Sequence, residues 1–367
     1  MLRTSIHSQT ASEKSTIEIQ RMIFQGPSQL QINTVDQLTL SPGPGETLVK
    51  LTMSTICGSD LHTFEGRRDG NPPSVLGHEG VGIVIATGSG ADESLLGKRV
   101  TWTLIDTCGS CKPCTQWNLP QKCHHLFKYG HSQITEGRGL NGCFASHILL
   151  RKGTHIVPLP DELSDAQAVP ANCALATMVA VIEPLLKAPK LPRKVLIQGA
   201  GLLGIYGTTL LKTAGVKKVW ITDISHGRLE FARNFGSKAI HRDDLNTIRD
   251  DTFDAVIEVA GISQIIAEGL RVLRPGGTYL WAGMVHDETP LDILGVEIVR
   301  GCATIIGVHN YAPRHLEEGI QFLTQSAPQF PWEQLVSPPY KLSQLNEAFA
   351  LAQTKKWHRV SVVPDNA

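Results

Sequence analysis

Apolar and polar positions along the chain follow two patterns that meet near residue 170. In the first part, short β-branched or alternating runs separated by Gly and Pro predict strands at 47–53, 80–86, 98–103 and 146–150. An apolar stretch from 174 then predicts a buried helix that ends at Pro184. Short strands with frequent turns are typical of a β-rich or barrel-like domain.

Beyond a Pro/Lys-rich linker at 188–193, near-continuous apolar strands alternate with helical stretches. The predicted strands are 195–198, 218–223, 255–259 and 277–281, and the predicted helices end near 214, 235 and 273. This alternation is typical of a doubly wound parallel sheet, so the fold class is α/β. From about residue 311 the character is mixed again, and a last strand at 359–363 is expected to rejoin the first domain.

These patterns predict one β-rich domain at 19–173 and 311–367, interrupted by a nucleotide-binding domain at 174–310. A chain of 367 residues suits two domains. Residues 1–18 read as a flexible extension, although the Ser/Thr-rich stretch without an acidic residue before Glu13 faintly resembles a transit peptide.

Charge and hydropathy exclude some function classes. The 34 Lys and Arg balance the 34 Asp and Glu, which gives no electrostatic case for nucleic acid or an anionic membrane. No apolar run approaches the roughly 20 residues needed to span a bilayer, and no secretory signal is evident. The cytoplasm is therefore the expected location, with a small molecule as substrate.

A glycine loop provides the first candidate chemistry. The G-x-G-x-x-G string follows an apolar strand, opens a helical pattern and precedes Asp223 by 19 residues, which makes a weak motif specific. The loop leads into free N–H groups at a helix start, where phosphates bind. Asp223 favours NAD over NADP, and Arg228 could soften that preference. The alternatives are a loop that binds FAD and a glycine turn that binds no ligand. The expected cofactor contacts in the loop are Gly199, Gly201, Leu202, Leu203 and Gly204.

Four of the eight cysteines lie within 16 residues: Cys108, Cys111, Cys114 and Cys123. In a long chain without a signal peptide, this spacing favours a metal site over disulfides. Four thiolates are the ligand set of a closed structural zinc site, and an iron–sulfur cluster is the competing interpretation.

Three further segments carry potential ligands: Cys57 with Ser59, Asp60 and His62; His78 with Glu79; and Cys173. Taken singly, each has an ordinary explanation as a core or turn residue. Their spacing alone does not establish a metal site.

With these motifs in the same chain order, the sequence resembles the zinc-dependent medium-chain alcohol dehydrogenases from about residue 20 onward. The resemblance implies a GroES-like β domain split around a Rossmann domain. It implies that Cys57, His78 and Cys173 hold a catalytic zinc, with Glu79 as an occasional ligand and Thr177 at the nicotinamide. Asp60 would orient the His ligand. The gap from Thr115 to Lys122 is one residue longer than is usual in that family, which makes Cys123 the least certain structural ligand.

The implied mechanism is oxidation of a zinc-activated alcohol by hydride transfer to NAD. Ser59 would take the hydroxyl proton and pass it, by way of the cofactor ribose, to His62. The family also implies a homodimer or homotetramer.

The substrate is less constrained. The nearest likeness is to dehydrogenases associated with phosphonate catabolism, on strings such as 128–131, 170–173 and 307–313. Arg67 and Arg68 could meet a phosphonate or carboxylate, or be solvated loop residues. Alternatives are a polyol or amino-alcohol dehydrogenase, a zinc-free reductase of the same fold, and a non-catalytic nucleotide-binding protein.

Overall fold

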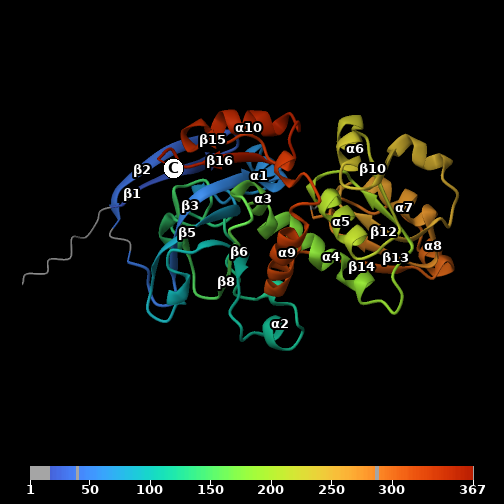
Figure 1. Cartoon of the computed structure of the whole chain (residues 1–367), viewed down its shortest axis with the longest axis horizontal. Coiled ribbons are helices and arrows are strands. Elements are labelled where there is room, and N and C mark those ends of the chain that lie inside the picture. The colour runs from blue at the N-terminus through green and yellow to red at the C-terminus, as the bar shows by residue number, and fades with distance from the viewer. Residues whose placement is uncertain (1–16, 39–40, 286–288, 367) are drawn as a thin grey trace, which may run out of the picture.

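A computed structural model describes residues 17–38, 41–285 and 289–366. Most of the predicted 1–18 extension lies outside the described residues, and the first strand begins at Ile17, two residues before the expected boundary. Figure 1 shows a β-rich lobe and a parallel-sheet lobe side by side, with α4 (Ala176–Leu186) and α9 (Pro313–Ser326) between them.

Within the described residues, the β-rich lobe contains two sheets. The smaller has the order β2-β1-β4, and the larger runs β15-β16-β3-β5-β6-β8, with β7 pairing to β3. The strands are β1 (Ile17–Gly26), β2 (Gln29–Leu38), β3 (Thr47–Ile56), β4 (Ser74–Val75), β5 (Glu79–Thr87), β6 (Arg99–Asp106), β7 (His147–Leu150), β8 (Thr154–Pro158), β15 (Tyr340–Lys341) and β16 (Val360–Val363).

The predicted return of the chain is confirmed, because β16 pairs antiparallel with β3. Helix α10 (Leu345–Gln353) packs beside it and buries Phe349 against Phe64 of α1 (Gly58–Phe64), with ring centroids 4.4 Å apart. The C-terminal segment is thus built into the lobe that carries Cys57.

The second lobe is a parallel sheet of order β11-β10-β9-β12-β13-β14. This order confirms the predicted Rossmann-type α/β class, and the chain reverses direction across the sheet between β9 and β12. The strands are β9 (Lys194–Gln198), β10 (Lys218–Asp223), β11 (Lys238–His241), β12 (Phe253–Glu258), β13 (Leu273–Trp281) and β14 (Thr304–Gly307), and the helices are α5 (Leu202–Thr213), α6 (His226–Arg233), α7 (Ile266–Val272) and α8 (Gly295–Gly301).

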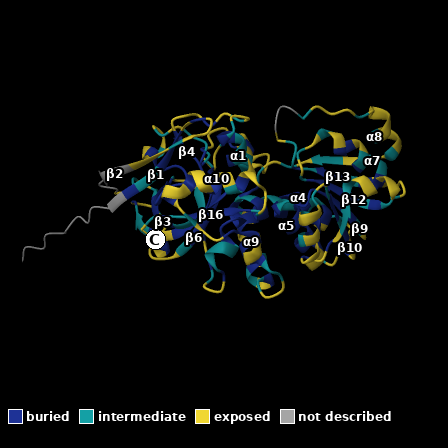
Figure 2. Cartoon of the chain, turned by 90° about the horizontal axis from the view of Figure 1, so that it is seen from above, coloured by how far each residue is buried: buried dark blue, intermediate teal, exposed yellow. Residues whose placement is uncertain are grey.

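Helix α4 is almost wholly buried between the lobes (Figure 2). It continues two residues past Pro184, where the sequence predicted its end. The amide of Lys187 still bonds the carbonyl of Glu183 at 2.9 Å, so the missing proline N–H costs the helix one hydrogen bond without stopping it. The helix α9 that packs against it was not predicted.

By length and composition, one helical stretch in the described residues, Asp165–Leu186, is apolar enough to cross a membrane. The expectation that no run approaches this length was wrong. However, 72% of the apolar window is buried inside the protein, as in the core helix of a folded domain.

Candidate functional site

The first cluster of metal-binding groups is formed by Cys57, His78, Glu79 and Cys173. One ligand atom from each lies within 4.8 Å of those from the others. Cys57 immediately precedes α1, Glu79 begins β5 with His78 just before it, and Cys173 lies in a π-helical turn, η4 (Ala171–Leu175). The four residues therefore come from three elements separated by up to 116 positions and converge where the lobes meet.

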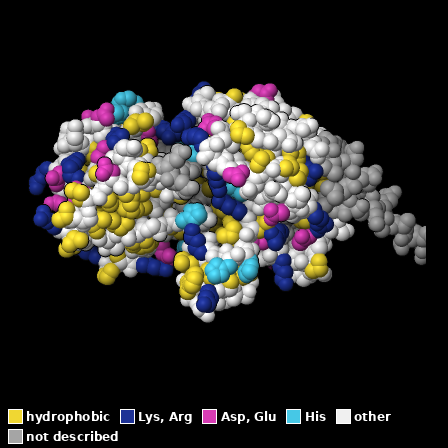
Figure 3. All heavy atoms as spheres, turned by 180° about the vertical axis from the view of Figure 1, so that it is seen from behind, with side chains coloured by type: hydrophobic (Ala, Val, Ile, Leu, Met, Phe, Trp, Pro, Cys, Tyr) yellow, Lys and Arg dark blue, Asp and Glu magenta, His cyan; other side chains and the backbone are white. Residues whose placement is uncertain are grey.

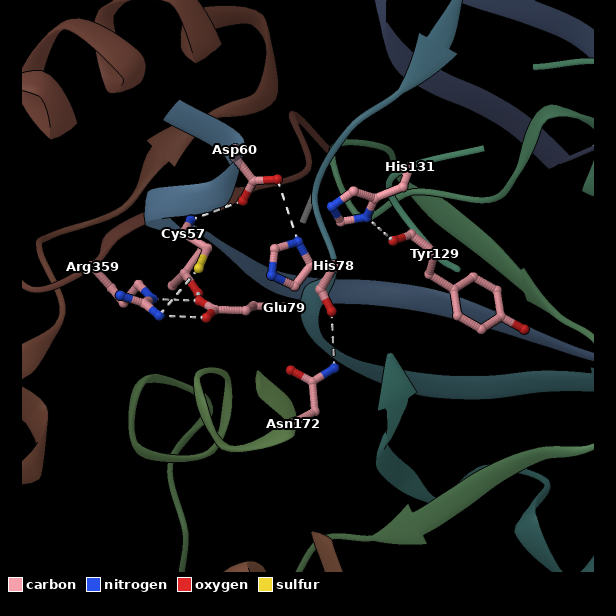
Figure 4. Close-up of polar contacts among 9 residues, drawn as sticks. Cys57, Asp60, His78, Glu79, Tyr129, His131, Asn172 and Arg359 are labelled. Carbon is pink, nitrogen blue, oxygen red and sulfur yellow. Dashed lines mark hydrogen bonds and ion pairs between the residues drawn. The ribbon is translucent and has the colours of Figure 1, made fainter. Parts of the chain in front are cut away.

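Asp60 holds two members of this cluster in place (Figure 4). One carboxylate oxygen accepts the Cys57 amide at 2.9 Å, and the other lies 3.4 Å from Nδ1 of His78. The remaining ring nitrogen of His78 points toward Cys57 and Glu79. A carboxylate at the far nitrogen is the usual support for a metal-binding imidazole.

The buried charges favour a cation at this point. Burial lowers the pKa of His78, but the Asp60 carboxylate outweighs it and, together with Cys57, raises the pKa to about 10. A hydrogen bond from Cys173 and the charge of Arg359 lower the pKa of the Cys57 thiol, although burial opposes them. An environment that stabilises an imidazolium and a thiolate also stabilises a metal ion, so the donor set fits zinc.

The Glu79 carboxylate is bound by Arg359, a residue whose role the sequence did not indicate. Arg359 donates from Nε and Nη2 to the two carboxylate oxygens at 2.6 and 2.7 Å, and Thr55 donates to one of them at 2.5 Å. The same guanidinium lies 3.4 Å from the sulfur of Cys57. The pair is inaccessible, with Glu79 at 0% and Arg359 at 7% exposure.

The turn that carries Cys173 is anchored by its neighbours. The Asn172 amide donates to the carbonyls of His78 and Trp102 at 3.0 Å each, and the Tyr311 hydroxyl donates to the carbonyl of Asn172. Tyr311 also accepts the amide of Leu104 at 3.2 Å. These bonds fix Cys173 against the strands that bear His78, and no spacing pattern in the sequence indicated them.

The four-cysteine lobe also closes on itself. All four sulfurs lie within 4.8 Å, with Cys111 at 3.5 Å from Cys114 and 3.8 Å from Cys123. Four sulfurs at 2.3 Å from a tetrahedral zinc lie about 3.8 Å apart, so the spacing fits that ion. A left-handed Asn118 and a 3₁₀ turn at Pro120–Lys122 absorb the extra residue and bring Cys123 back to the others.

The glycine loop has the expected form. Gly199 has φ +116°, and a Cβ on Gly204 would lie 2.0 Å from the Gly199 carbonyl oxygen, so helix α5 packs too closely for any other residue. A Cβ on Gly201 would meet nothing within 4 Å, which leaves open space before the helix start. Leu202 and Leu203 form the first turn of α5.

Asp223 lies at the end of β10, half-buried, and its carboxylate accepts the amides of Ala200 and Ser225 at 2.8 and 2.9 Å. Arg228 is on α6, and Thr177 is half-buried near the start of α4, four residues after Cys173. Nε2 of His358 donates to the Ala200 carbonyl at 3.3 Å, so the residue next to Arg359 touches the glycine loop.

Two family models match the chain: "Alcohol dehydrogenase GroES-like domain" over residues 43–161 and "Zinc-binding dehydrogenase" over residues 203–325. An L-threonine 3-dehydrogenase of Streptomyces avermitilis is 31% identical over 73% of this chain and 77% of its own length. The chain belongs to the zinc-dependent medium-chain dehydrogenases.

A further relative and two solved structures are also similar to this chain. An L-threonine 3-dehydrogenase of Thermococcus kodakarensis is 26% identical over 88% of this chain and 92% of its own. An alcohol dehydrogenase structure from Thermotoga maritima superposes with a TM-score of 0.86 at 25% identity, covering 95% of this chain and all of the other. An Escherichia coli CFT073 alcohol dehydrogenase in complex with NADH shares the fold, with a TM-score of 0.81 at 23% identity over 94% of this chain and 99% of the other.

The cysteine lobe of this dehydrogenase yields a metal-content prediction. The wild-type protein should hold about two zinc ions per chain by mass spectrometry, and Cys114→Ser should hold about one and have a lower Tm, because a closed Cys₄ site stabilises its loop. Cys302→Ser, at an exposed cysteine outside both clusters, is the matched control. An unchanged zinc content in Cys114→Ser would contradict the structural site.

The buried ion pair yields a stability prediction. Arg359→Met leaves the Glu79 carboxylate without its partner and should cost about 3–5 kcal/mol in unfolding free energy. Denaturant unfolding with and without a chelator measures this cost and separates it from zinc loss. The double variant Glu79→Gln/Arg359→Met should recover most of the stability, and equal losses in the single and double variants would count against an electrostatic cause.

Proposed function

We propose that this dehydrogenase moves a hydride between an alcohol and NAD, giving the aldehyde or ketone. The observation that carries the proposal is the convergence of Cys57, His78 and Cys173 at the junction of the lobes. The contact of His358 with Ala200 supports a link from this cluster to the glycine loop. Family membership establishes the broader class, an oxidoreductase acting on an alcohol.

In this proposal, Cys57, His78 and Cys173 hold the catalytic zinc, and three protein ligands leave a position for substrate. Glu79 stays behind them, because both of its oxygens already accept hydrogen bonds from Arg359. Asp60 fixes the His78 ring. When bound, zinc supplies a Lewis acid that lowers the pKa of an alcohol, and NAD supplies the hydride acceptor.

Ser59 and His62 carry the proton. They lie three residues apart on α1, which places them on the same side of the helix. Ser59 accepts the hydroxyl proton beside Cys57, and His62, whose ordinary pKa lies near neutrality, releases it toward solvent.

The cofactor preference rests on Asp223. Its position at the end of β10, bonded to the loop amide of Ala200, supports a role in which the carboxylate accepts hydrogen bonds from a ribose hydroxyl and repels a 2′-phosphate. Thr177 meets the nicotinamide end, one helical turn from Cys173. Arg228 lies in the first turn of α6, where its amide donates to the Ser225 hydroxyl. Its positive charge would weaken the discrimination against NADP.

The relatives named L-threonine 3-dehydrogenase make an amino-alcohol a second substrate candidate. The Cys173 ligand favours a plain or anionic alcohol, because polyol and amino-alcohol members often place Glu at the third position. Hydroxyalkylphosphonates remain among the candidates.

The test is steady-state NAD reduction with simple alcohols, L-threonine, polyols and hydroxyalkylphosphonates. Wild type should prefer NAD to NADP, and Asp223→Ala should shift that ratio toward NADP by about 10–100-fold, because about 1.4 kcal/mol corresponds to each tenfold change. Ser59→Ala should lower kcat with little change in KM for NAD. Absence of NAD reduction with every alcohol in zinc-loaded protein would overturn the proposal.

We further propose that a second copy of the chain covers the free edge of the parallel sheet. Strand β14 ends that sheet, and exposed apolar side chains lie beside it, with Leu294 at 66% and Val299 at 75% exposure. Figure 3 shows hydrophobic side chains gathered on this lobe. An unpaired edge strand beside apolar surface favours symmetric self-association.

Light scattering after size exclusion should therefore find a dimer or tetramer for wild type. Val299→Asp should shift it toward the monomer, because a buried unpaired charge opposes association. Leu96→Asp, at a 56% exposed residue of the other lobe, is the control and should not change the mass. A monomeric wild type would refute self-association.

A further inference from the structure

Lys128 is carried to the side of the metal cluster by a segment that the zinc chemistry does not use. Residues 127–131 run along β6, with the Tyr129 amide bonded to the Leu104 carbonyl at 3.1 Å. A Cβ on Gly130 would lie 2.4 Å from the carbonyl oxygen of Gly77. The segment therefore packs directly against the residue that precedes His78.

His131, three residues further, confirms how close this segment comes. Its ring centroid lies 5.3 Å from that of His78 (Figure 4), and its Nδ1 bonds the Tyr129 carbonyl at 2.8 Å. Burial holds the pKa of His131 well below its ordinary value, so the ring is neutral beside the cluster.

The Lys128 ammonium is a half-buried charge that no acidic side chain neutralises. Within the described residues it makes no ion pair and donates no hydrogen bond. Burial and, after it, the charge of Arg68 lower the pKa of Lys128 to about 8, against the opposing charges of Cys173, Cys57 and Asp60. Lys128 thus belongs to a segment packed against Gly77 and His78, and the charges of the cluster and of Arg68 act on it.

Arg68 is a second cation of this kind. It is half-buried, and no carboxylate in the described ranges pairs with it. Its neighbour Arg67 differs, because it is exposed and forms an ion pair with Glu65. Arg67 and Arg68 therefore have different surroundings, and it is the charge of Arg68 that acts on the pKa of Lys128.

The opposite lobe completes the group. Nδ1 of His309, two residues beyond β14, lies 2.5 Å from Nζ of Lys122, and burial lowers the pKa of His309 to about 4. His309 also lies within electrostatic range of Lys128 and Arg68. Figure 3 shows Lys, Arg and His side chains gathered in the hollow between the lobes.

We propose that Lys128 and Arg68, flanked by the Lys122–His309 pair, bind an oxyanion on the substrate. The inference rests on the proposed alcohol oxidation and names its substrate class: a short hydroxyalkyl chain that ends in a phosphonate, phosphate or carboxylate. The hydroxyl end lies at the zinc ligands, and the anionic end lies between Lys128 and Arg68.

An oxyanion on the substrate would supply the negative charge that no acidic side chain of the described residues supplies to Lys128 and Arg68. A half-buried lysine without a counter-charge is costly, and an anion that accepts hydrogen bonds from it removes that cost. A guanidinium adds a planar pair of donors that matches phosphonate or carboxylate oxygens. The Asp60 carboxylate, which acts on the pKa of Lys128, does not neutralise it, because Cys57 and His78 already occupy its two oxygens.

The test compares hydroxyethylphosphonate, hydroxypropionate and n-propanol as substrates. Lys128→Met should lower kcat/KM for the anionic alcohols about 30-fold, or about 2 kcal/mol, mainly through KM, and leave n-propanol within about twofold. Arg68→Gln should behave similarly, Lys128→Arg should retain most of the activity, and Arg67→Gln is the matched control with no effect. The anionic alcohol with the larger ratio of wild-type kcat/KM to Lys128→Met kcat/KM shows whether the site prefers a tetrahedral phosphonate or a planar carboxylate.

A second readout does not depend on turnover. Isothermal titration with methylphosphonate and with acetate should detect binding to wild type and to Arg67→Gln, and its loss in Lys128→Met, with Tm confirming that each variant is folded. Anion binding without oxidation of any alcohol would reject the proposed function and keep the anion site. Equal losses on n-propanol and the anionic alcohols, or unchanged anion binding in Lys128→Met, would overturn the anion site alone.

Discussion

The ion pair between Glu79 and Arg359 is the interaction on which the arrangement of the site depends. It joins the start of β5 to the residue before β16, 280 positions later in the chain, and both strands pair with β3. Two charges removed from water are tolerated only with close geometry and additional hydrogen bonds, and the second donor of Arg359 and the Thr55 hydroxyl supply these. The backbone at His78 and at His358 is therefore fixed by the same contact. One residue faces the metal cluster and the other touches the glycine loop.

Two groups of side chains with opposite electrostatic preference lie close together at the junction of the lobes. Around Cys57 and His78, a carboxylate and a thiolate favour a cation. Lys128 and Arg68, on the neighbouring segments, favour an anion. A substrate with a hydroxyl at one end and an oxyanion at the other matches this polarity. A neutral alcohol would interact with the metal cluster but not with Lys128 and Arg68. The same polarity gives the site a preferred substrate orientation, because a reversed molecule would leave Lys128 and Arg68 without an anion.

The sequence was informative wherever the chemistry is local. The glycine loop, the close spacing of the four cysteines and the strand limits of β5 and β10 depend on neighbouring residues, and the structure reproduces them. Lys128 and Tyr311 stand in short strings that the sequence singled out, and Arg359 begins a predicted strand, but none of these patterns indicated the contacts that the residues make when distant strands pack together. Arg67 and Arg68 could not be distinguished, because their different surroundings arise from Glu65 on one side and the 127–131 segment on the other. The predicted helix end at Pro184 was wrong for a related reason, because packing between the lobes stabilises a helix that local propensity would end.

The π-helical turn at Ala171–Leu175 explains why the direction of the Cys173 side chain could not be predicted from its spacing to Thr177. A π turn inserts one residue into the helical repeat, which rotates the side chains before it relative to those after it. In a continuous α-helix, Cys173 and Thr177 would lie on one face, and their directions could be read from the sequence. Here the bonds from Asn172 to the carbonyls of His78 and Trp102 set the direction of Cys173 independently of α4. Cys173, the third ligand in the proposed zinc site, is thus positioned by contacts of its turn with the β-rich lobe rather than by the helix that follows it.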